Sequence, residues 1–162
     1  MRWDKEHGGT RNWEVFKIIP TNPHHMNRDG PGDLIDTYGI LVIKAPQAMK
    51  SVMSPAHDDH AQIWINGEKW YNNSQWTGDA LQVDFNIEIE LKKGGNILLY
   101  RCGESAGHAY MNLHFDDKTH ATVEIYPDKA VDQRSFFNEI AGALAVDPVG
   151  KLTTTWGDLK RK

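Results

Sequence analysis

Residues 61–71, AQIWINGEKWY, decide the fold that we expect for this chain. Residues 61–66 alternate with a period of two, which predicts a strand with one buried face. Asn66 and Gly67 follow at once, and this pair is the strongest short signal of a hairpin because both residues tolerate the positive φ of a tight turn. Residues 69–71 then predict the returning strand.

Similar signals recur on both sides of this hairpin. Apolar or alternating runs end at clusters rich in Pro, Gly and Asn, such as residues 20–33 and 93–96, which are typical of loops and turns. We expect further strands over residues 13–19, 38–44, 85–91, 97–102, 110–115 and 122–126. Many short strands separated by turns indicate a mainly β protein built as an antiparallel sandwich or barrel.

The sequence changes character after Pro127. In residues 133–145 the apolar residues recur at helical spacing, and Asp132 or Ser135 is suited to cap the helix. The apolar set of this helix is Phe136, Phe137, Ile140 and Leu144. Residues 153–160 predict a second short helix, so the chain is expected to end in a helical tail.

The bulk composition fits a single domain. The chain has 162 residues, of which 40% are hydrophobic and 25% charged. We divide it into a β-sandwich binding domain, residues 1–128, and a helical C-terminal extension, residues 129–162, that packs on it or forms a junction. No run approaches the ~20 apolar residues of a membrane span. We expect a soluble protein, and leave open an extracellular location or a place within a larger secreted protein.

Charge and cysteine content exclude some classes of function. A net charge of −4 argues against binding a phosphate backbone, because the only basic run is residues 160–162, so we expect no nucleic-acid partner and no membrane partner. The single cysteine, Cys102, cannot form an intrachain disulfide. It lies in an apolar run and is expected as a small buried hydrophobe.

Residues 58–71 and 84–102 contain a series of sequence features in an order that is found in a known protein family. An acidic pair precedes a strand that ends in Asn-Gly; an Asp-led strand, LKKGGN and a long apolar strand come later. This order resembles the galactose-binding-domain-like β-sandwich, which includes many carbohydrate-binding modules and the sugar-binding domains of family 2 glycoside hydrolases. The resemblance spans about residues 34–116, and Trp13 matches an early core tryptophan. It implies a jelly-roll sandwich, but that fold hosts sugar binding, protein binding and scaffolding alike.

Residues 57–60, His-Asp-Asp-His, stand directly before the strand expected at 61–66. His and Asp are common metal ligands, and loop ends beside strands are where sites collect. With a period of two, His57 and Asp59 share one side, and Asp58 and His60 share the other. The alternative is a turn in which the Asp side chains cap backbone amides.

The resemblance also implies a structural calcium ion in a loop remote from the ligand face. Calcium takes several oxygen ligands. The pairs Asp58-Asp59 and Asp116-Asp117 each adjoin an expected strand end and are the candidates for it. We expect no other cofactor.

An aromatic group interleaved with amides lies between residues 64 and 76. Flat aromatic faces stack on sugar rings while amides bond the hydroxyl groups, a common composition for a polar binding site. The expected ligand-binding set is Trp64, Trp70, Tyr71, Asn72, Asn73, Trp76, Glu104 and His108. Trp76 is expected to be exposed because its loop is polar, whereas Trp64 and Trp70 are equally suited to fill the sandwich.

Three functions are open at this point. The first, which we favour, is a non-catalytic module that binds a carbohydrate or a similar polar ligand. The second is a metal-dependent enzyme that uses the His and Asp clusters, although the chain has no G-x-S-x-G and no phosphate-binding loop motif. The third is an assembly domain whose C-terminal helices dock a neighbouring domain or a second copy.

Overall fold

The computed structural model describes residues 13–16, 18–26, 33–127 and 132–144 of the chain. Strands dominate these residues, and two short helices follow the last long strand. The strands are β1 (Ile35–Ala45), β2 (Met49–Asp58), β3 (His60–Ile65), β4 (Glu68–Asn73), β5 (Ile87–Leu91), β6 (Gly94–Glu104), β7 (Tyr110–Phe115) and β8 (Glu124–Tyr126). The helices are α1 (Asp117–Thr122) and α2 (Gln133–Leu144).

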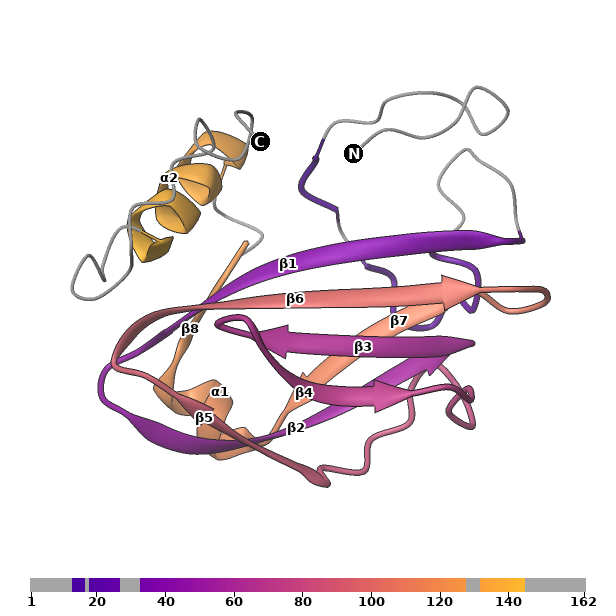
Figure 1. The fold of residues 1–162 in the computed structure, drawn as a ribbon, viewed down its shortest axis with the longest axis horizontal. Coiled ribbons are helices and arrows are strands. Elements are labelled where there is room, and N and C mark those ends of the chain that lie inside the picture. Colours follow the sequence, from indigo (N-terminus) through magenta and orange to yellow (C-terminus); the bar gives the residue numbers. More distant parts are fainter. Residues whose placement is uncertain (1–12, 17, 27–32, 128–131, 145–162) are drawn as a thin grey trace, which may run out of the picture.

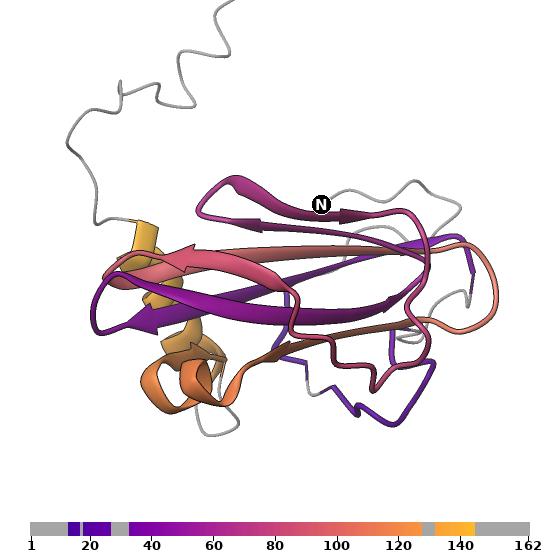
Figure 2. The same ribbon diagram turned by 90° about the horizontal axis from the view of Figure 1, so that it is seen from below.

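The strands form two antiparallel sheets. The larger sheet has the order β4-β3-β6-β1-β8, and the smaller has the order β5-β2-β7. Figure 2 shows the two sheets as stacked layers, with both helices at one end. The β2–β3 connection and the β6–β7 loop lie at the opposite end (Figure 1). The mainly β architecture is therefore confirmed, and the layers are compatible with a β-sandwich.

The hairpin between β3 and β4 forms as the sequence predicts. Asn66 has φ 54° and Gly67 has φ 86°, the left-handed values that this turn requires. Asn66 also donates from Nδ2 to Oδ1 of Asn96, at 2.9 Å. Asn96 is fully buried, and its Oδ1 accepts the Lys92 N–H at 2.8 Å. Two turns that are distant in sequence are thus fastened to one buried amide.

The core lies between the two sheets, and in the strands with a regular alternation every second residue faces inward. The central strand β6 shows this most clearly, with Leu98, Tyr100 and Cys102 at most 4% exposed. Cys102 is the buried hydrophobe that the sequence predicts, and burial raises the pKa of its thiol. From the other sheet, Met53 and Ile89 join the same core.

Three expectations about strands are wrong. The strand expected over residues 122–126 begins only at Glu124, because Thr122 is the last residue of α1. Residues 13–16, 18 and 19 are not in a strand, and Trp13 is 43% exposed rather than a core tryptophan. The strand expected to begin at Phe85 begins at Ile87, because Phe85 has φ 45° and is 43% exposed. Residues 13–16, 18 and 19 have high β-propensity but no neighbouring strand to pair with among the described residues. Before β5 the chain still follows β2, but there the Asp84 N–H donates to the Ser54 hydroxyl at 2.6 Å instead of joining the ladder.

The helix expected near residue 133 is present as α2. Asp132 caps it, accepting the Ser135 N–H at 2.9 Å. Phe136 is buried, Phe137 is 41% exposed, and Glu139 forms a 2.6 Å ion pair with Lys44 of β1. The expected helix at residues 153–160 lies outside the described residues. Within the described part of the chain, neither helix is long and apolar enough to cross a membrane.

Candidate metal and ligand site

The chain passes from one sheet to the other at the end of β2. β2 ends at Asp58 and β3 begins at His60, so Asp59 alone links strands of different sheets. The peptide bond between Asp58 and Asp59 is cis. The Asp59 N–H donates to the Gly103 carbonyl oxygen at 2.8 Å. This bond holds the end of β6 against the connection and brings Glu104 beside the two aspartates.

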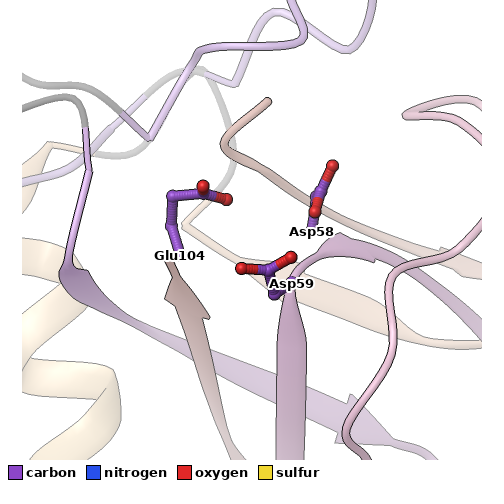
Figure 3. A group of neighbouring side chains, drawn as sticks. All are labelled: Asp58, Asp59 and Glu104. Atoms are coloured by element: carbon purple, nitrogen blue, oxygen red, sulfur yellow. The ribbon is translucent and has the colours of Figure 1, made fainter. Parts of the chain in front are cut away.

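Three carboxylates meet here, and we call Asp58, Asp59 and Glu104 the acidic corner. One oxygen from each lies within 4.8 Å of the others. Figure 3 shows the Glu104 carboxylate turned toward the two aspartates. Glu104 alternates with Cys102 and Tyr100 along β6, so it points to the core side of the sheet and is only 3% exposed.

The Glu104 carboxylate lacks a well-formed hydrogen bond within the described part of the chain. Both of its oxygens are buried, and among the described residues neither meets the geometry of a hydrogen bond, although the Ala106 N–H is near enough to lower the pKa of the carboxylate somewhat. Burial, followed by the negative charges of Asp59 and Asp58, raises the pKa of Glu104 to about 7. Buried polar groups in folded proteins are nearly always paired. A buried carboxylate without a partner, next to two other carboxylates, therefore indicates a site that binds a cation or a proton.

The two aspartates differ in their proton affinity. Burial and a hydrogen bond shared with Asp59 raise the pKa of Asp58 to about 6. Burial acts in the same direction on Asp59, but Ser105 overcomes it and lowers the pKa of this carboxylate. Ser105 donates to Asp59 Oδ2 from its backbone N–H, at 2.8 Å, and from its hydroxyl group. The acidic corner therefore holds one firmly ionised carboxylate and two that titrate near neutral pH.

The donor atoms of the acidic corner suit a hard divalent cation. All three donors are carboxylate oxygens, the type that calcium and magnesium prefer. No second group of this kind, of three or more His, Cys, Asp or Glu, is found among the described residues. The pKa values of Asp58 and Glu104 are raised to about 6 and about 7, so a bound cation would displace the protons that these carboxylates still hold and balance the buried charge.

His57 is hydrogen-bonded to the backbone of the acidic corner. It is fully buried, and its Nδ1 donates to the Asp59 carbonyl oxygen at 3.0 Å. Its Nε2 accepts from the Tyr71 hydroxyl at 2.8 Å, and that oxygen accepts from Asn73 at 3.0 Å. Both ring nitrogens are thus engaged, and burial lowers the pKa of His57. His60 lies 3.8 Å from Asp36, and its charge contributes to the lowered pKa of Asp59.

The second acidic pair has a structural role at a helix end. Asp116 is the N-cap of α1, and its carboxylate accepts the Thr119 N–H at 2.7 Å. Asp117 is the first residue of that helix and is exposed. Of the two calcium candidates, only Asp58-Asp59 lies in a carboxylate cluster among the described residues.

The aromatic and amide residues expected to bind a ligand do not lie together. Some lie on the outer side of the larger sheet, some pack against the core, and Trp76 lies in the loop after β4. Trp64 lies with Asn72 on the outer side of the larger sheet, where Lys69 stands 4.9 Å from the Trp64 ring centre and Asn72 bonds Gln62. Trp70 and Tyr71 pack against the core. These residues do not line one cleft together with the acidic corner.

Trp76, Glu104 and His108 are the expected ligand residues that lie at or near the acidic corner. Trp76 is 64% exposed. It precedes Thr77, whose N–H donates to the His57 carbonyl oxygen at 2.9 Å and whose hydroxyl accepts the His57 N–H at 2.9 Å. His108 is close enough to Asp58 to lower its pKa through charge.

All three residues of the acidic corner were candidates from the sequence, but their proximity to one another was not predicted. Asp58 and Asp59 were expected as candidate metal ligands from their position before a strand, whereas Glu104 was expected only in the ligand-binding set. What joins them is the pairing of β3 with β6, in which His60 lies opposite Gly103. Because β3 pairs with β6, the acidic pair before β3 and Glu104 at the end of β6 lie at the same end of the sheet. This pairing brings the candidate metal ligands Asp58 and Asp59 beside a residue of the expected ligand-binding set.

Comparisons of the chain with protein-family models, with curated proteins and with solved structures found no match.

Proposed function

We propose that the protein is a non-catalytic binding module that holds a divalent cation, calcium above all, at the acidic corner and binds a carbohydrate there. The observation that carries the proposal is Glu104, whose two buried oxygens lack partners while facing Asp58 and Asp59. An ionised group buried in this way is costly unless another charge neutralises it. A divalent cation supplies that charge and the missing contacts at once.

Calcium fits the donor set better than a transition metal. Zinc sites are built mainly from His and Cys, whereas His57 has both ring nitrogens engaged and Cys102 is buried with a protonated thiol. Calcium takes about six to eight oxygen ligands in flexible geometry. Three carboxylates fill only part of that shell and leave positions for the hydroxyl groups of a ligand.

Trp76 supplies the second part of the proposed ligand site. The next residue, Thr77, is bonded to His57 and its carbonyl oxygen accepts the Tyr110 hydroxyl at 2.7 Å, so the backbone that carries the exposed Trp76 is fixed beside the strand end at Asp58. A sugar presents adjacent hydroxyl groups on its rim and an apolar ring face, so it can coordinate a cation and stack on an aromatic side chain together. A polyhydroxylated ring is therefore the ligand class that uses both features.

We also assign the two sheets to the galactose-binding-like jelly roll. The support is the order of sequence signals over about residues 34–116, together with the long β6 in the middle of the larger sheet. A non-catalytic carbohydrate-binding role is common in that fold class, which agrees with the proposed function.

Calorimetric titration of the EDTA-treated full chain with calcium tests the cation. We expect one calcium ion per chain, and at least a tenfold loss of affinity in Glu104→Gln, because the variant keeps size and loses charge. Glu88→Gln, which alters an exposed glutamate on β5, is the matched control and should bind as wild type does. Unchanged calcium affinity in Glu104→Gln would contradict the proposal, as would absence of binding to the wild-type chain.

A panel of immobilised glycans, probed with and without calcium, tests the ligand. Binding should require calcium and should be lost in Trp76→Ala, while the calcium affinity and melting temperature of that variant stay unchanged. The variant separates the ligand from the cation because Trp76 is exposed and contributes no carboxylate. If the wild-type protein binds calcium but no glycan, the proposed cation site is retained and the proposed carbohydrate ligand is rejected.

A further inference from the structure

A short segment, residues 22–26, lies along the open edge of β7. In the smaller sheet β7 pairs with β2 alone, so its other edge has no strand partner among the described residues. The Met26 N–H donates to the Ala109 carbonyl oxygen at 3.0 Å, and the Ala109 N–H donates to the Pro23 carbonyl oxygen at 2.7 Å. Ala109 is thereby held from both sides at the point where β7 begins.

His25 fastens this segment to β7. Its ring is 4% exposed, and its Nδ1 is 2.9 Å from the Asn22 carbonyl oxygen, which can only accept, so Nδ1 carries a hydrogen. The Nε2 of the neutral ring then accepts the Met111 N–H at 3.0 Å. A protonated ring would instead donate from Nε2 to the Met111 carbonyl oxygen, also at 3.0 Å. The contact with β7 is available in either protonation state.

The loop between β6 and β7, residues 105–109, is therefore held at both ends. At one end Ser105 donates twice to Asp59 of the acidic corner. At the other end Ala109 is bonded to the segment that His25 secures. Between the two anchors His108 meets His24 of that segment edge to face, with ring centres 5.2 Å apart.

We propose that His25 is a positioning residue for the acidic corner. Its ring fixes residues 22–26 on β7, that segment fixes Ala109, and the loop then holds Ser105 against Asp59 and keeps Glu104 beside it. The inference rests on the proposed cation site, since calcium affinity is its main readout. His25 has no role as a ligand, because both of its nitrogens are engaged with backbone groups.

Three substitutions distinguish positioning from general destabilisation. A Gln amide reaches the place of Nε2 and can bond Met111, whereas an Asn amide reaches only the place of Nδ1 and can bond Asn22. We therefore expect calcium to bind about tenfold more weakly to His25→Ala and His25→Asn, as loss of roughly one buried hydrogen bond predicts, and near wild-type affinity in His25→Gln. His120→Ala, an exposed histidine in α1, is the matched control.

Calorimetric titration with calcium at 10 °C, with the folded state checked by circular dichroism, is the first measurement. The second is amide hydrogen exchange of Ser105, at the far end of the loop, which should quicken in His25→Ala and recover in His25→Gln. Equal calcium affinity in all variants of a calcium-binding wild type overturns the inference. If wild type binds no calcium, the proposed function fails, and the positioning role is then decided by Ser105 exchange, with unchanged exchange overturning it.

Discussion

Replacing Glu104 by Gln should stabilise the metal-free protein at alkaline pH. The carboxylate is 3% exposed and unpaired, and its pKa is raised from 4.5 to about 7. At about 1.4 kcal/mol for each pKa unit, that rise corresponds to roughly 3 kcal/mol of lost stability once Glu104 is ionised in the folded state. The amide introduced by Glu104→Gln carries no charge and can donate to Asp58 or Asp59, so this cost disappears.

The sign of the pH dependence follows from the same pKa. Below about pH 4.5 Glu104 is protonated in both states and costs nothing. Between about pH 4.5 and 7 the unfolded chain ionises while the folded chain keeps its proton, so the free energy of unfolding falls as pH rises. Above about pH 7 the full cost is present. The advantage of Glu104→Gln over wild type should therefore be small at pH 5 and about 3 kcal/mol at pH 8.

Urea unfolding in EDTA at pH 5, 6, 7 and 8 measures this difference, with Glu88→Gln as the control for a glutamate that is exposed on β5. Excess calcium at pH 8 should then stabilise wild type more than the variant and narrow their difference by about 1.4 kcal/mol for each tenfold difference in calcium affinity. A Glu104→Gln protein that is less stable than wild type at pH 8, or a difference that does not change with pH, would refute the reasoning.

Three further predictions concern the fold and the thiol. Asn96→Ala should lower the free energy of unfolding by about 2–4 kcal/mol in urea, because it leaves the Lys92 N–H and other buried groups without their partner. Asp116→Ala should cost about 1 kcal/mol by removing the cap that accepts the Thr119 N–H, while Asp116→Asn should be nearly neutral in the same assay. Cys102 should react with a thiol reagent only as fast as the protein unfolds, because the thiol is buried and its pKa is raised; rapid labelling of the native protein would contradict this.

Local signals were sufficient for much of the fold. The β3–β4 hairpin depends on Asn66 and Gly67, whose backbone preferences act within the turn itself. The helix α2 likewise follows from spacing and from a cap at Asp132. Residues 13–19 have strand propensity as well, but a strand needs a neighbour, and the ladder that decides this is made by distant residues. Propensity predicted most of the strands but missed β2, Met49–Asp58, and it did not tell which segments find a partner.

The candidate site shows the same division between local and distant information. The chain contains two Asp-Asp pairs beside strands, and nothing within either pair tells a ligand from a cap. Asp116 accepts the N–H of a residue three positions ahead, so its role is complete within one helical turn. Asp58 and Asp59 acquire theirs only because β3 pairs with β6, which brings the buried, unpaired Glu104 beside them. The third carboxylate distinguishes the pairs, and it reaches the corner through strand register, which no local pattern specifies.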